Sequence, residues 1–238
     1  MTTRIQMWSS PRNLSTAIMY AWRQRTDTTV VDEPLYAHYL RVSGRVHPGR
    51  EDVLASQRTD GEAVVRDVLM APYETPVVFF KQMAKHLVQV SRDFIPACHN
   101  VLLTREPLEM LTSLQRQLPD ATVEDTGFET LLEILQWLRD RGETPIVIDT
   151  QRLLQDPQQV LTALCERVGL AFDPAMLAWP AGPKPEDGVW APHWYASVHR
   201  STGWKPWVPK PDALRPTLQP VLETIRPMYE ALVPYAIG

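Results

Sequence analysis

The sequence has few of the residues that build disulfides and metal centres. Its 238 residues include two cysteines and six histidines. Cys98 and Cys165 lie far apart in apolar surroundings, which predicts two buried free thiols rather than a disulfide framework. The histidines are scattered without the spacing of a ligand set. We therefore expect no metal site.

The chain also lacks long apolar runs and a strong charge of either sign. No apolar stretch is long enough to span a bilayer, and no basic start followed by an apolar core forms a signal peptide. The formal net charge of -4 argues against broad electrostatic binding to nucleic acid or to anionic membranes. The basic residues must therefore act locally. A chain of this length is expected to form one domain, 1–238.

Short apolar runs alternate with helical patterns along the chain. The alternation predicts an α/β fold, in which helices cover both faces of a central parallel sheet of about five strands. The predicted strands span 4–9, 28–31, 76–81, 99–104 and 144–149. The predicted helices span 14–25, 51–70, 83–90, 108–117, 127–142, 157–168 and 215–233.

The first predicted strand leads into a polar loop and then into a helix. Residues 9–16 read Ser-Ser-Pro-Arg-Asn-Leu-Ser-Thr. Such a junction suits an anion, because free backbone N–H groups and the positive end of the helix dipole point at the loop. Arg12 adds a cation, and Ser15 and Thr16 add hydroxyl groups. The loop lacks the Gly-Lys-Ser/Thr of a Walker A motif, and an ordinary capped strand–turn–helix is the alternative.

A second strand end carries similar chemistry. Arg105 follows the predicted strand at 99–104, and Ser113 lies eight residues further on, along a predicted helix. An arginine fork binds a phosphate with two hydrogen bonds, and a hydroxyl adds another. Ligands of open α/β sheets bind beyond the carboxyl ends of the strands. The alternative is a surface salt bridge from Arg105 to Glu106 or Glu109.

These segments resemble the bacterial sulfotransferases of the P-loop fold, which transfer a sulfuryl group from 3′-phosphoadenosine 5′-phosphosulfate (PAPS). The resemblance implies a three-layer P-loop sandwich, PAPS as co-substrate and 3′-phosphoadenosine 5′-phosphate (PAP) as product. A late segment resembles the family loop over the 3′-phosphate, although a plain loop is the alternative. The chain departs from the family at Asn13 and Leu14, where Ser and Gly are usual and where leucine disfavours a positive φ. The donor-binding residues that the resemblance implies are Ser10, Pro11, Arg12, Asn13, Leu14, Ser15, Thr16, Arg105, Ser113, Arg200, Ser201, Thr202 and Gly203.

The resemblance also implies the catalytic groups. Glu33 follows the strand at 28–31 at the position of the family's general base, and His38 is the alternative base. Lys81 ends another strand, and with Arg12 it would stabilise the charge that develops on the leaving phosphate. For Asp32, a structural role is as well supported as a catalytic one.

The C-terminal part of the chain is dense in proline and tryptophan. The segment 179–211 predicts little regular structure and is interpreted as a lid, before a C-terminal helix within 212–238. Trp204 and Trp207 either stack on the purine or belong to the core. Residues 41–51 form a polar basic loop, which either borders the acceptor or is simply solvated.

The sequence thus predicts a cytoplasmic, PAPS-dependent sulfotransferase that acts on a hydroxyl or amine of a small-molecule acceptor. The aromatic side chains favour an apolar or aromatic acceptor. A nucleotide-dependent small-molecule kinase and a non-catalytic protein that binds a phosphorylated ligand are the alternatives. The identity of the acceptor and the oligomeric state, a homodimer included, stay open.

Overall fold

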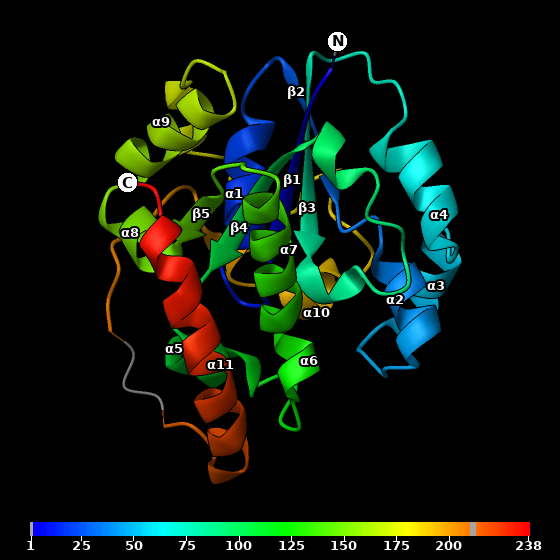
Figure 1. The fold of residues 1–238 in the computed structure, drawn as a ribbon, viewed down its shortest axis with the longest axis vertical. Helices are drawn as coiled ribbons and strands as arrows, with labels where there is room; N and C mark the ends of the chain where they lie inside the picture. Colours follow the sequence, from blue (N-terminus) through cyan, green and yellow to red (C-terminus); the bar gives the residue numbers. More distant parts are fainter. Residues whose placement is uncertain (1, 210–212) are drawn as a thin grey trace.

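The computed structural model describes residues 2–209 and 213–238, and a parallel sheet lies at its centre (Figure 1). The strand order is β2-β3-β1-β4-β5, and all neighbouring strands are parallel. This sheet confirms the five predicted strands. They are β1 (Thr3–Ser9), β2 (Thr28–Asp32), β3 (Val77–Met83), β4 (His99–Thr104) and β5 (Ile146–Asp149).

Helices cover both faces of the sheet, because successive strand residues point to opposite sides and both sides are apolar. In β3, Val77 and Phe79 belong to one core cluster and Val78 and Phe80 to another. The predicted three-layer α/β sandwich is therefore confirmed. The first cluster is covered by α1 (Ser15–Arg23) and α9 (Pro157–Arg167), and the second by α5 (Pro107–Leu114), α7 (Phe128–Asp140) and α11 (Gln219–Leu232).

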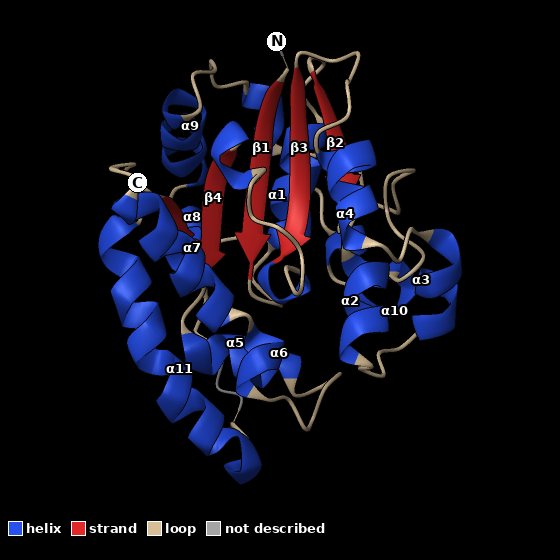
Figure 2. Cartoon of the chain, turned by 45° about the vertical axis from the view of Figure 1, so that its right-hand side comes forward, coloured by secondary structure: helices blue, strands red, loops and turns tan. Residues whose placement is uncertain are grey.

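Most of the remaining helices lie near the carboxyl ends of the strands, whereas α4 lies beside the sheet. Figure 2 shows the strand arrowheads pointing toward the end of the molecule where α5 and α6 lie on one side and α2, α3 and α10 on the other. Apolar residues of α2, α3 and the α10 region form a third, smaller cluster that contains Tyr36, Leu40 and Trp190. The remaining helices are α2 (Tyr36–Ser43), α3 (Arg50–Ser56), α4 (Gly61–Val64), α6 (Val123–Thr126), α8 (Thr150–Gln155) and α10 (Ala191–Trp194).

Two of the predicted helices are wrong in extent or in type. The segment 83–90 is not a helix: β3 continues through Met83, which pairs with Ser9, and a single 3-10 turn follows at Ala84–His86. The predicted helix at 51–70 is broken after α3, because the Gln57 side chain bonds the backbone of Ala37 and Glu33 instead of continuing the helix.

The predicted loop at 41–51 is shorter than expected, because α2 ends at Ser43 and α3 begins at Arg50. The segment predicted as a lid is irregular apart from α10 and a 3-10 turn at Val198–Arg200. Its last two residues, and residue 212 of the predicted C-terminal segment, lie outside the described residues. No helix in the described ranges is both long enough and apolar enough to cross a membrane.

Candidate active site

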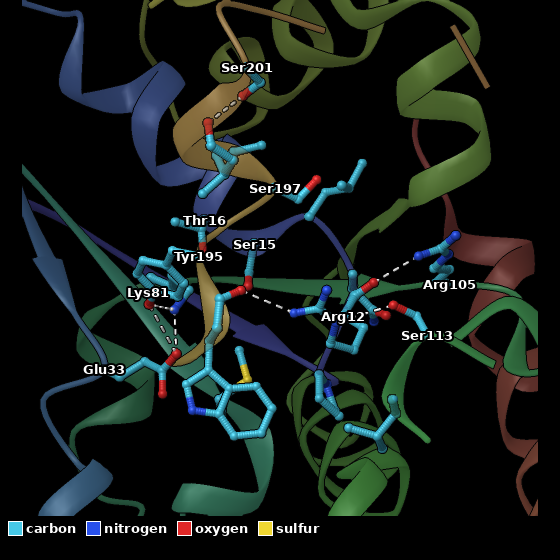
Figure 3. Close-up of a pocket in the computed structure, with 18 of the residues that line it drawn as sticks. Arg12, Ser15, Thr16, Glu33, Lys81, Arg105, Ser113, Tyr195, Ser197 and Ser201 are labelled. Carbon is cyan, nitrogen blue, oxygen red and sulfur yellow. Dashed lines mark hydrogen bonds and ion pairs between the residues drawn. The ribbon is translucent and has the colours of Figure 1, made fainter. Parts of the chain in front are cut away.

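A cavity of about 410 Å³ lies at the carboxyl ends of the strands, where open α/β sheets bind their ligands. Its walls include residues near the carboxyl ends of four strands. Figure 3 labels three of them, Glu33, Lys81 and Arg105. The volume is within the range of small-molecule sites, about 300–1,000 Å³. The strand-end residues in the wall are Pro11 beyond β1, Glu33 after β2, Lys81 within the end of β3 and Arg105 after β4.

The loop after β1 forms one wall and holds an uncommon backbone shape. Arg12 and Leu14 have φ values of 63° and 65°, in the left-handed region that non-glycine residues rarely occupy. Leu14 is the N-cap of α1 but supplies no side-chain hydrogen bond to the first turn. The N–H groups at the start of α1 are therefore available to a ligand, and Ser15 and Thr16 line the same cavity.

Contacts from neighbouring strands hold this loop. Arg105 donates from Nη1 to the Arg12 carbonyl at 2.9 Å. The Asn13 amide donates to the Leu103 carbonyl at 3.3 Å, and the Thr150 hydroxyl donates to the Asn13 carbonyl at 3.3 Å. The strained shape is thus fixed by the surrounding structure, as is typical of functional sites.

Cations gather at the end of the cavity near β4, where Figure 3 shows Ser113 and Arg105 on the same side of Arg12. Arg12 donates from Nε to Ser113 Oγ at 3.1 Å and from Nη1 to the Trp194 carbonyl at 3.2 Å, so both acceptors are uncharged. Burial and then the charge of Arg105 lower the pKa of Arg12. Two arginines so close together in a buried wall suit an anion between them.

Arg105 also forms the ion pair that the sequence offered as its alternative role. Its Nε and Nη2 lie 3.1 and 3.0 Å from Glu109 Oε2. The pair is not on the surface, because Arg105 is buried and lines the cavity. Nη1 and Nη2 each carry a second N–H group. These two groups can donate to a ligand.

A buried network occupies the opposite end of the cavity (Figure 3). The Lys81 ammonium donates to Asp32 at 2.8 Å, to Tyr195 Oη at 2.7 Å and to Glu33 Oε1. The Tyr195 hydroxyl donates to Asp32 Oδ2 at 2.7 Å and accepts from Trp190 Nε1 at 2.9 Å. Tyr195 belongs to the irregular C-terminal segment, so the network joins that segment to the ends of β2 and β3.

Burial and charge set the protonation of this network. Desolvation raises the pKa of Glu33, although the charge of Lys81 acts against the increase. Burial alone would lower the pKa of Lys81, but the carboxylates of Asp32 and Glu33 outweigh it and raise that pKa. Lys81 is therefore held as a cation beside a carboxylate that accepts a proton more readily than an exposed glutamate. Asp32 is saturated by Lys81, Tyr195 and the Gly188 N–H, which supports a structural role.

Aromatic and imidazole rings line the cavity beyond Glu33. His86 stacks on Tyr36, with ring centroids 4.6 Å apart, and its Nδ1 lies 3.9 Å from Glu33 Oε2. His47 Nδ1 lies 2.7 Å from the Tyr36 hydroxyl. The sequence offered the loop 41–51, which contains His47, as a border of the acceptor, but it did not assign His86 or Lys85 to the site. His86 and Lys85 occupy a 3-10 turn, and only their nearness to Lys81 in the chain pointed to them.

Several predicted site residues lie away from the cavity. His38 is absent from its walls, and the two ring nitrogens of His38 lie 3.2 and 2.7 Å from the carbonyls of Thr59 and Val88. The structure therefore does not bring His38 to the cleft of Glu33. Ser10 is buried outside the wall, and the side chains of Arg200 and Thr202 are exposed outside it.

The rest of the late loop does reach the cavity. Ser201 and Gly203 line it, and the Ser201 hydroxyl accepts from Trp179 Nε1 at 3.1 Å. Trp204 and Trp207 also line it, so their rings are not simply core. No cluster of metal-ligating side chains occurs within residues 2–209 and 213–238.

The fold and this cavity define an α/β protein whose candidate site lies at the carboxyl ends of a parallel sheet. The chain belongs to the sulfotransferase-domain family, whose model matches residues 3–236. Two solved structures share the fold: the sulfotransferase domain of the Synechococcus PCC 7002 olefin synthase and that of the curacin biosynthetic pathway. Each has a TM-score of 0.51, with 16% and 14% identity, and the match covers 94% of this chain and 94% and 98% of those chains.

Two curated relatives come from Arabidopsis thaliana and are called branched-chain-amino-acid aminotransferase-like proteins 1 and 2. They are 39% and 36% identical to this chain over 229 residues, which is 96% of its length. The chain spans 41% of the length of each relative. Their names refer to proteins more than twice as long as the matched region.

Proposed function

We propose that this protein transfers a sulfuryl group from PAPS to a hydroxyl group of a small-molecule acceptor. The observation that carries the proposal is one cavity with an arginine pair at one end and a Glu–Lys pair at the other. The two ends match the two demands of the reaction, since the donor is a polyanion and the acceptor must lose a proton.

The residues of the arginine end fit the donor. The N–H groups at the start of α1, with Ser15 and Thr16, would bind the 5′-phosphosulfate, and Arg105 and Ser113 would bind the 3′-phosphate. Leu14 lacks the side-chain cap that would compete for those N–H groups. The aromatic rings of Trp204 and Trp207 lie in the same wall and offer surfaces on which a purine can stack.

The opposite end would carry the transfer. Glu33 takes the proton of the acceptor hydroxyl as its oxygen forms a bond to sulfur, and the bond from sulfur to the 5′-phosphate oxygen breaks in line. The leaving phosphate keeps the electron pair, and Arg12 and Lys81 stabilise its negative charge. Lys81 is suited to this role because its raised pKa keeps it charged.

Calorimetric titration with PAP, and in parallel with ADP and magnesium, tests the donor site. We expect tight binding of PAP and weak binding of ADP, because only PAP carries the 3′-phosphate. Arg105→Ala should weaken PAP binding roughly ten- to hundredfold, as expected for lost hydrogen bonds to a charged group.

Arg200→Ala is the matched control, because Arg200 is exposed and lies outside the cavity wall. Its PAP affinity should equal that of the wild type. Binding of magnesium-ADP alone would favour a kinase, and binding of neither nucleotide would contradict a nucleotide-dependent transferase.

A further inference from the structure

The part of the cavity beyond Glu33 contains polar groups that the transfer reaction does not use. Lys85 belongs to the 3-10 turn after β3 and lines the cavity with His86 and His47. The rings of Tyr36 and Trp190 form the apolar surface around them. The acceptor of the proposed reaction would lie in this region, next to Glu33, whose Oε2 is 3.9 Å from His86 Nδ1.

Lys85 is a buried cation whose ammonium has no hydrogen-bond acceptor among the described residues. Its side chain is 8% exposed, and its closest carboxylate oxygen, Asp125 Oδ1, is 3.8 Å away. Asp125 is already bound by the fork of Arg45 and by Thr122. The ammonium also lies over the ring of Tyr39, 5.2 Å from its centroid. Burial lowers the pKa of Lys85 to about 8, although the charge of Glu33 acts against the decrease.

The two neighbouring imidazoles are also incompletely bonded. His47 Nε2 and His86 Nδ1 are buried and have no hydrogen-bond partner among the described residues. Burial lowers the pKa of His47 to about 3 and that of His86 well below its usual value, so both rings are neutral at pH 7. Buried polar groups in native proteins are nearly always bonded to protein, ordered water or a ligand. These two nitrogen atoms and the Lys85 ammonium therefore offer binding groups to an acceptor.

We infer that this region binds a carboxylate of the acceptor through Lys85, so that the acceptor is a small hydroxy acid with an apolar body. The inference rests on the proposed function, since it assigns the acceptor of that reaction. A carboxylate offers the ammonium a charge-assisted hydrogen bond. The apolar body would lie against Tyr36 and Trp190, with its hydroxyl group at Glu33.

The charges disfavour the other acceptor classes. A protonated amine would place a third cation beside Lys85 and Lys81. A phosphate dianion carries two negative charges, and the single charge of Lys85 balances one of them. The other would lie unbalanced close to Glu33. A single carboxylate matches the single ammonium.

The test compares two acids, mandelate and 3-hydroxy-3-phenylpropanoate, with their methyl esters. The acids differ in the spacing between hydroxyl and carboxylate, and each ester removes the charge while it keeps the apolar body and the hydroxyl. Binding to the full chain saturated with PAP is measured by calorimetry. We expect at least one acid to bind about tenfold more tightly than its ester or better.

Lys85→Met should remove this preference and leave ester and PAP affinity unchanged. Lys184→Met is the matched control, because the Lys184 ammonium binds the carbonyls of Pro180 and Gly182 outside the cavity. It should keep the preference for acids.

Equal binding of acid and ester by the wild-type protein, or no binding of either acid at millimolar concentration, would overturn the inference without any variant. An acid preference that survives in Lys85→Met would also overturn it. Failure of the proposed function is distinct, because the protein would then not bind PAP in the first titration.

Discussion

The Glu33 carboxylate has one oxygen bound to Lys81 and the other 3.9 Å from an imidazole nitrogen of His86. If it is the general base, Glu33→Gln should lower the turnover number about 10²–10⁴-fold, because the amide cannot take a proton. PAP affinity should stay unchanged. Since burial raises the pKa of Glu33, wild-type turnover should fall on acidification at a pH above the usual range of a glutamate.

The control is Glu74→Gln, because Glu74 is exposed and lies outside the cavity wall. The readout is PAP formation in the presence of an acceptor, followed across pH. Undiminished turnover of Glu33→Gln would remove Glu33 from the mechanism.

Tyr195 is the hydroxyl through which the irregular C-terminal segment reaches Lys81. Tyr195→Phe would leave the buried Trp190 Nε1 without its acceptor and would take one hydrogen bond from Asp32. The free energy of unfolding should decrease by about 1–3 kcal/mol. Turnover should also decrease, because Lys81 loses one of its three anchors.

Tyr73→Phe separates the two effects, since the Tyr73 hydroxyl bonds only the Val68 carbonyl, away from the cavity. It should cost about 0.5–1.5 kcal/mol of stability without a change in turnover. Urea unfolding and initial rates measure both quantities. A Tyr195→Phe protein that turns over at the wild-type rate would show that the network does not position Lys81.

The residues at strand ends could be predicted one by one from the sequence, whereas the sequence offered the loop 41–51 as a border of the acceptor without showing which of its side chains reach the cavity. Glu33 and Arg105 follow apolar runs, and a parallel sheet necessarily brings such positions to one edge. His47 lies in a loop, and tertiary contacts alone place it beside the Tyr36 hydroxyl. Arg200 shows the converse limit: a family-like sequence motif does not decide which side chain faces the cavity.

At the scale of elements, the loop from β1 to α1 carries an uncommon conformation without glycine. Leu14 lies at φ 65° and ψ 18°. At such a position glycine is unstrained, whereas alanine pays about 1 kcal/mol or more. Leu14→Gly should therefore be more stable than Leu14→Ala by about 1 kcal/mol, although both lose the leucine side chain.

Ala17→Gly in α1 is the matched control, because glycine inside a helix costs about 0.5–1 kcal/mol relative to alanine. The sign of the glycine effect should thus reverse within three residues of the chain. Urea unfolding midpoints with equal m-values measure the differences. A more stable Leu14→Ala protein would contradict the left-handed backbone at this position.

The strands were easier to predict than the helices for a physical reason. A strand buried on both faces is a continuous apolar run, and β3 is buried at every residue. The helical pattern of the sequence continues across Gln57, although the backbone of Gln57 is extended and its side chain bonds the backbone of Ala37 and Glu33. The same pattern wrongly predicted a helix from residue 83, at the end of β3, where Gln82 and Met83 pair with β1.

At the scale of the whole molecule, buried neutral histidines couple the fold to pH. Burial lowers the pKa of His47 to about 3 and also lowers the pKa of His86. In the unfolded chain these rings have a pKa of about 6.5. Above about pH 6.5 these rings are neutral in both the folded and the unfolded state, so they do not lower the free energy of unfolding. As the pH falls, the unfolded state binds more protons than the folded state, and the free energy of unfolding decreases.

The free energy of unfolding should consequently decrease between roughly pH 7 and pH 5, by up to about 1.4 kcal/mol per pH unit for each buried histidine. His47→Gln should reduce this slope, since glutamine keeps a polar partner for Tyr36 but does not titrate. Urea unfolding at several pH values gives the slope. An unchanged slope in His47→Gln would mean that His47 is already protonated in the folded protein at pH 5. In that case the acceptor end would carry a second cation, and the carboxylate proposed for the acceptor would be bound more tightly in acid.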